Sequence, residues 1–393
     1  MYESACMTDD DEAFLNCLRD APDGGWDGHL SRLLPSDWDR ILQMARLHAL
    51  APWLYEKLRD QPLLPVSVRD TLQRAYYYST ARNLRIQAQW RELLALFDRH
   101  GIRVVTLKGC DLAWFVYPEP GLRPMTDIDL LLEEKDIASA GVLLVANGYR
   151  ADTGASGASG KHTMPYLKHG GVPVELHYHL AEPPYAERIN LAELRARTRE
   201  VDGCTVRCLG PEDRLLYLAL HTCLAHGLDA GLLPFIDMQR ILHVDGQRLD
   251  TRALVERARQ WGVERALSVM LGLMQRFLDG VPPVLPLPPV APAMLEASVP
   301  FVLERPCRLP EGFMKALTAG SGARTWQIIQ SRLFESHGQG GGRPVAGTVQ
   351  RLAGLLRKYS RSIAGGVFRH RELRQRIRRE QQRRALIDWI ARG

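Results

Sequence analysis

The chain lacks any long hydrophobic run. None of its 393 residues lies in a stretch apolar for long enough to span a bilayer. The first residues include Asp9-Asp10-Asp11-Glu12, whereas a secretory signal would have a basic start followed by an apolar segment. Because the sequence contains neither a recognisable signal nor an anchor, we expect a cytoplasmic location.

Cysteine is also scarce. The seven cysteines are an odd number scattered through a long chain. Small secreted domains build disulfide frameworks from regularly spaced cysteines in short sequences, so this pattern argues against such a framework. We expect reduced, partly buried thiols.

A Walker-type glycine loop is missing as well, which argues against a kinase-like phosphotransferase. The chain is otherwise ordinary in composition: 46% of its residues are apolar and 24% are charged, as in soluble globular proteins. A chain of this length and composition is able to bury a hydrophobic core and to form two or three domains.

Positive charge is concentrated in the last part of the chain. Residues 343–393 contain fourteen Lys and Arg against three Asp and Glu, whereas the preceding residues carry a small net negative charge. A basic tail of this kind binds RNA, an anionic membrane surface or an acidic partner. The alternative is a solvated helix face without a partner.

Hydrophobic periodicity and turn residues indicate an α+β protein. Short β-branched or alternating runs at 102–107, 127–132 and 172–177 predict strands, and helical periodicity dominates before and after them. We therefore predict five parts. They are an N-terminal helical region (1–100), an α+β core (101–210), a helical domain (211–290), a connector with short helices (291–342) and a basic helical tail (343–393).

Three carboxylates stand out in the predicted core. Asp127 and Asp129 flank Ile128 at the start of an apolar run, and strand alternation would project both from one face. Glu175 lies in a second segment of similar character. Acidic groups that meet on one sheet face are what a pair of divalent cations requires, and this favours phosphoryl or nucleotidyl transfer. A solvated strand end is the alternative for the Asp pair.

Residues suited to phosphate lie near these carboxylates. Lys108 and Gly109 form a strand-to-helix turn, where glycine allows phosphate to approach the backbone amides and Lys108 adds a positive charge. Arg123 would contact phosphate oxygens with its forked guanidinium. His177 follows Glu175 by two positions, which places it near metal or phosphate. The alternatives are salt bridges to the carboxylates for Lys108 and Arg123, and a polar cleft lining for His177.

Four further polar residues are weaker candidates. Lys161 and His162 follow the Gly/Ser-rich segment 154–160 and would close over a nucleotide, although exposed loop bases usually have no role. His221 and Asp237 lie on helices expected beside the sheet. A buried hydrogen-bonded pair explains them at least as well as a contact with substrate.

Several segments together resemble a known family. They are LKG at 107–109, the Tyr-Pro break at 117–118, RPMTDIDLL at 123–131, VELH at 174–177 and PEDRLLYLALH at 211–221. In combination they are similar to the bacterial uncharacterised nucleotidyltransferase family within the polymerase-beta nucleotidyltransferase superfamily. The resemblance extends from about residue 36 to residue 285.

The resemblance implies a nucleotidyltransferase core with a small mixed β-sheet, flanked by N-terminal and C-terminal helical regions. It also implies transfer of a nucleoside monophosphate from an NTP, with ATP as the expected donor, to a hydroxyl or amine acceptor, with release of pyrophosphate. By matching positions, Asp127, Asp129 and Glu175 would be catalytic and would bind Mg²⁺ or Mn²⁺.

The sequence departs from the superfamily at the phosphate-binding turn. Where the superfamily usually has Gly-Ser, this chain has Gly109-Cys110, so the serine hydroxyl is absent. The competing hypothesis is therefore a weakly catalytic nucleotide-binding scaffold. Such a scaffold would dock on a partner, RNA or a membrane surface through the basic tail.

Overall fold

The computed structural model describes residues 7–20, 26–152, 160–200, 206–279, 284–304 and 370–392. The chain divides into two compact units, Met1–Glu304 with Trp389–Gly393 and Arg305–Asp388. Most of the predicted connector and residues 343–369 of the basic tail lie outside the described residues, as does segment 153–159. The five-part division and the partners of the tail therefore stay predictions.

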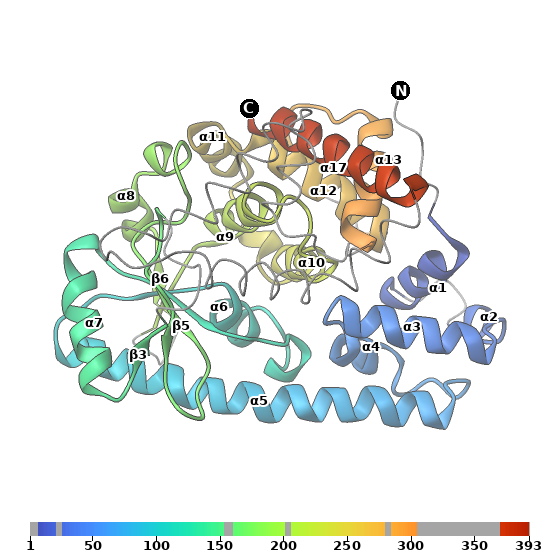
Figure 1. Ribbon diagram of the computed structural model, residues 1–393, viewed down its shortest axis with the longest axis horizontal. Helices are drawn as coiled ribbons and strands as arrows, with labels where there is room; N and C mark the ends of the chain where they lie inside the picture. The colour runs from blue at the N-terminus through green and yellow to red at the C-terminus, as the bar shows by residue number, and fades with distance from the viewer. Residues whose placement is uncertain are drawn as a thin grey trace, which may run out of the picture. The chain divides into compact units, whose positions relative to one another are not determined.

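A group of helices precedes the sheet. They are α1 (Asp9–Leu18), α2 (Asp27–Leu30), α3 (Pro35–Leu47), α4 (Ala51–Leu58) and α5 (Val66–Arg99). Helix α5 has 34 residues and extends from the strands to the N-terminal helices (Figure 1). It ends just before Gly101, whose φ of +71° is a left-handed conformation that glycine adopts readily.

The core contains a mixed sheet of seven short strands in the order β3-β4-β5-β2-β1-β7-β6. They are β1 (Val105–Leu107), β2 (Ile128–Leu131), β3 (Arg150–Ala151), β4 (Tyr166–Leu167), β5 (Val174–His177), β6 (Arg199–Glu200) and β7 (Arg207–Cys208). Strand β2 pairs antiparallel with β1 and parallel with β5. The predicted α+β fold with a small mixed sheet is confirmed, and the three strands predicted to carry the site are neighbours.

The remaining elements connect the strands or follow them. They are α6 (Lys108–Phe115), η1 (Pro120–Leu122), η2 (Glu134–Asp136), α7 (Ile137–Ala146), η3 (Ala186–Arg188), α8 (Leu191–Ala196), α9 (Pro211–Ala219), the π-helix η4 (Leu220–Ala225), α10 (Leu233–Asp245), η5 (Gly246–Arg248), α11 (Thr251–Trp261), α12 (Glu264–Leu278), α13 (Pro292–Leu303) and α17 (His370–Ala391). In the described ranges no helix is both long and apolar enough to cross a membrane.

The two faces of β2 have different surroundings. Ile128 and Leu130 belong to the main core cluster, together with Trp90 and Phe97 of α5. Asp129 lies between these two apolar residues, and side-chain alternation directs it to the opposite face. Packing against α5 therefore fixes the orientation of β2 and with it the side of the sheet on which the carboxylate lies.

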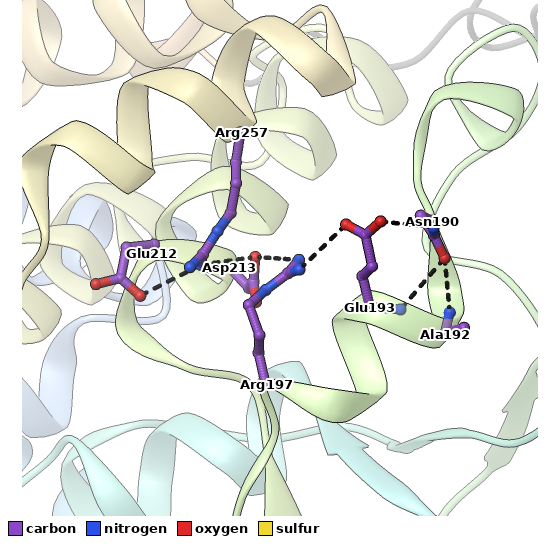
Figure 2. Close-up of polar contacts among 7 residues, drawn as sticks. All are labelled: Asn190, Ala192, Glu193, Arg197, Glu212, Asp213 and Arg257. Carbon is purple, nitrogen blue, oxygen red and sulfur yellow. Dashed lines mark hydrogen bonds and ion pairs between the residues drawn. The ribbon is translucent and has the colours of Figure 1, made fainter.

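Buried ion pairs fasten the start of α9 to this core. The Arg214 guanidinium donates to both carboxylate oxygens of Asp111 in α6, over 2.9 and 2.6 Å. Asp213 accepts hydrogen bonds from Arg197, which follows α8, and from Arg257 of α11 (Figure 2). Charged groups at this depth require such partners, because an unpaired buried charge is costly. The position of α9 relative to α6 and α11 is thereby constrained.

We expect Asp111→Asn to lower the free energy of unfolding by about 3 kcal/mol, because it removes the carboxylate that accepts two hydrogen bonds from the buried Arg214 guanidinium and leaves it with the Asp245 pair at 3.1 Å. Urea unfolding measures this loss. The control is Glu256→Gln, which breaks the exposed Arg252 pair and should leave the midpoint unchanged. Equal midpoints for the two variants would show that the buried pair does not hold α9 in place.

Candidate functional site

Two of the three predicted carboxylates meet His177 on one sheet face. Asp129 is the register partner of Glu175 in the parallel β2–β5 pair, so their side chains project to the same side. His177 is two positions beyond Glu175 and shares that side. Each of the three residues has one atom able to bind a metal ion, and these three atoms all lie within 4.8 Å of one another. The predicted convergence of these strands is therefore observed.

Asp129 is at the centre of the group and is only 1% exposed. Lys108 Nζ donates to its Oδ1 over 2.7 Å, and His177 Nε2 lies 2.8 Å from the same oxygen. Since a carboxylate oxygen only accepts, Nε2 carries the proton. The second oxygen, Oδ2, is buried and has no hydrogen-bond partner among the described residues. A buried oxygen of this kind fits a bound cation, which would supply the missing compensation.

The two aspartates differ in how strongly their charge is compensated. Burial acts to raise the pKa of Asp129, but the charge of Lys108 and the His177 hydrogen bond outweigh it and hold that pKa below its ordinary value. For Asp127, burial and the negative charge of Asp129 prevail and raise the pKa to about 6. At neutral pH Asp127 is therefore ionised, although burial and the nearby charge of Asp129 make its negative charge unfavourable. A divalent cation bound beside it would stabilise that charge.

Lys108 also forms the turn from β1 into α6. Its φ of +47° lies in the left-handed region, which costs a residue other than glycine of the order of 1 kcal/mol or more. A Cβ atom on Gly109 would lie 3.2 Å from Met125 Cγ and 3.3 Å from Arg123 Nη1. Glycine thus allows the 123–125 segment to pack closely against the turn. Its predicted role in admitting phosphate stays a prediction.

Arg123 forms a salt bridge, but not to the carboxylates considered from the sequence. Its Nε donates to Oδ1 of Asp237 in α10 and its Nη2 donates to Oδ2, both over 2.8 Å. The Tyr117 hydroxyl also donates to Asp237, over 2.7 Å. Asp237 thus fastens α10 to the segment before β2, and its described partners do not include His221. The predicted phosphate contact of Arg123 stays a prediction.

Three further side chains interact electrostatically with this group. Lys161 and His221 were weaker candidates in the sequence analysis, and Tyr217 was not a candidate. Burial and the positive charge of Lys108 lower the pKa of Lys161 and hold that of His221 well below its ordinary value. Burial raises the pKa of Tyr217, whose phenol also interacts electrostatically with Lys108 and Asp129. The sequence carried one signal for Tyr217 and His221: their spacing of four residues places them on one helix face.

The raised pKa of Asp127 generates a pH-dependent prediction. Folded protein binds this proton more tightly than unfolded protein, so the corresponding stability is present below about pH 4 and is lost as the pH rises through about 6. We expect Asp127→Asn to match wild type at pH 4 and to be more stable at pH 8, by at most about 3 kcal/mol. Urea unfolding across this range is the measurement, with the exposed Glu134→Gln as control.

Adding a divalent cation should reduce this difference in stability between Asp127→Asn and wild type. At pH 8, millimolar Mg²⁺ or Mn²⁺ should raise the unfolding midpoint of wild type, because bound cation relieves the repulsion between Asp127 and Asp129. The midpoint of Asp127→Asn should rise less. Equal rises in both proteins would argue against Asp127 as a ligand.

Comparison with known proteins places these residues in a family. Residues 35–279, more than half of the chain, match the family model described as "Uncharacterised nucleotidyltransferase". No curated protein and no solved structure matches the chain. The matched range includes β1, β2, β5 and α9, and hence the whole group around Asp129. The resemblance stated from the sequence is confirmed: the chain belongs to the uncharacterised nucleotidyltransferase family and is a nucleotidyltransferase.

Proposed function

We propose that the protein transfers a nucleoside monophosphate from an NTP, with ATP as the expected donor, to a hydroxyl or amine acceptor. Mg²⁺ or Mn²⁺ would be the cofactor. The observation that carries this proposal is the environment of Asp129. One of its oxygens is held by Lys108 and His177, and the other is buried without a hydrogen-bond partner among the described residues, beside Glu175.

The proposed cation ligands are Asp127, Asp129 and Glu175. Carboxylate oxygens are the ligands that Mg²⁺ and Mn²⁺ prefer. A bound divalent cation would neutralise negative charge on the triphosphate and polarise its reacting phosphoryl group. The raised pKa of Asp127 supports this assignment, because a group that is ionised at a cost gains most from a cation.

Glu175 is more accessible to an acceptor than Asp129 is. Its side chain is 21% exposed, against 1% for Asp129. In the proposed reaction the acceptor atom forms a bond to the α-phosphorus, and the bond from that phosphorus to the bridging oxygen breaks, leaving pyrophosphate with the electron pair. Glu175 takes the proton that the acceptor loses.

Lys108 and His177 would position Asp129 and meet the nucleotide. The pKa of Lys108 is raised, because the charge of Asp129 outweighs the effect of burial, so its ammonium is maintained at neutral pH. This ammonium is a suitable contact for the leaving pyrophosphate. The His177 hydrogen bond orients Asp129. Gly109 and Arg123 complete the proposed nucleotide contacts by shaping the turn beside Lys108.

The test is incubation of purified protein with each α-labelled NTP, Mg²⁺ and a cell extract as the source of acceptor. We expect pyrophosphate release and label transfer from at least one NTP. Asp129→Ala should reduce the rate by at least about 100-fold, because it removes a cation ligand, and Glu175→Gln should reduce kcat by about 100-fold or more by removing the base. Glu134→Gln, an exposed carboxylate just beyond β2, should retain the wild-type rate.

Two outcomes of the same assay would contradict the proposed function. If the protein binds an NTP but transfers no label and releases no pyrophosphate with any of them, the proposed reaction is wrong. Unchanged kcat in Asp129→Ala would likewise reject the assignment of the site.

A further inference from the structure

Tyr217 of α9 has a hydroxyl group that forms no hydrogen bond within the described part of the chain. The residue is 4% exposed, and its Oη is buried with no hydrogen bond to any of the described residues. Buried tyrosine hydroxyls normally find a partner, because leaving one unpaired costs free energy. Arg214, three residues before Tyr217, pairs with Asp111, three residues after Lys108, so the two side chains lie on helices that are joined one turn away. The phenol also interacts electrostatically with Lys108, Asp129 and Glu175.

Contacts of neighbouring residues restrict the position of Tyr217. It follows Asp213 and Arg214 by about one turn, and therefore lies near the helix face that the buried ion pairs fasten to the core. The ring of His221 packs edge-on against Tyr217 at a centroid distance of 5.9 Å. His221 belongs to η4, and π-helical turns of this kind occur often at functional sites. The His221 ring and the ion pairs about one turn earlier thus restrict the position of the phenol.

The turn Lys108-Gly109-Cys110 between β1 and α6 supplies a charge to the site but no hydroxyl. Lys108 provides an ammonium in the turn between β1 and α6. Cys110, two residues later, is buried in the hydrophobic core cluster, and burial raises the pKa of its thiol. The Tyr217 hydroxyl on α9 is a candidate hydroxyl donor to an anionic ligand beside Lys108.

We propose that Tyr217 binds the triphosphate of the NTP by donating its hydroxyl hydrogen to a phosphoryl oxygen beside Lys108. The inference rests on the proposed function and adds a contact from the helical region to it. A phosphoryl oxygen suits both neighbours, since it accepts from the phenol and is attracted by the ammonium. The unpaired hydroxyl of the free protein is then explained as a group kept ready for the ligand.

Tyr217→Phe tests this contact, because it removes one oxygen atom and preserves the ring. Isothermal titration calorimetry with Mg²⁺ compares two probes: inorganic tripolyphosphate and each of the four α,β-methylene NTPs, whose α–β bond is not cleaved. We expect Kd to rise about tenfold or more for both probes. Without ligand, the unfolding midpoint should equal or exceed that of wild type, since no hydrogen bond is lost.

Tyr149→Phe is the matched control. Tyr149 is also buried, but it belongs to the core cluster on the other side of β2. Its substitution should leave the Kd values for both probes unchanged. A similar loss of affinity in this variant would mean that the effect does not come from the site.

Each other outcome is decisive. Unchanged affinity in Tyr217→Phe, or a lower midpoint without ligand, overturns the contact. If Tyr217→Phe weakens binding of the NTP analogue but not of tripolyphosphate, the hydroxyl contacts the nucleoside and the proposed phosphate contact is wrong. The proposed contact is also wrong if the wild-type protein binds neither probe. Weaker tripolyphosphate binding in a protein that transfers no label would reject the proposed reaction and retain the contact.

Discussion

Burial of the Asp129 carboxylate is the constraint on which the rest of the site depends. An ion in this position is stable only with close partners, and these are Lys108, in the turn after β1, and His177 of β5. Lys108 reaches Asp129 from a turn with a left-handed backbone conformation, so local strain accompanies the electrostatic gain. The strand pairing, the turn and the histidine are therefore linked through one carboxylate.

The same principle operates at the boundary between the sheet and the helices that follow it. Arg214 with Asp111, and Arg123 with Asp237, are bidentate pairs that join elements far apart in the sequence. Such pairs contribute little net stability but strongly disfavour arrangements that separate them. The first pair joins α9, which carries Tyr217, to α6, and the second joins α10 to the segment before β2. A family of nucleotidyltransferases needs this kind of precision because catalysis by charge and position tolerates little displacement.

Much of the sheet followed from local rules. Alternation around Ile128 placed Asp129 on the face away from the core, and Gly101 marked the end of α5. The partner of Arg123 did not follow from such rules. Asp237 lies 114 residues away, and any of several carboxylates would have satisfied the guanidinium. The place of Tyr217 near the acidic group was equally unpredictable from the sequence, because a tyrosine within a leucine-rich helix is usually part of a hydrophobic core.

The sequence by itself determined the α+β class, the acidic strand and the family, since these depend on periodicity and on short segments of fixed residue type. Only the tertiary structure decided which groups compensate one another. It gave Asp129 its lysine and histidine, both at Oδ1, and paired Arg123 with Asp237. It left Oδ2 of Asp129 and the hydroxyl of Tyr217 unpaired among the described residues. The physical reason is that burial and electrostatic pairing are properties of neighbours in space, which adjacent residues in the chain do not specify.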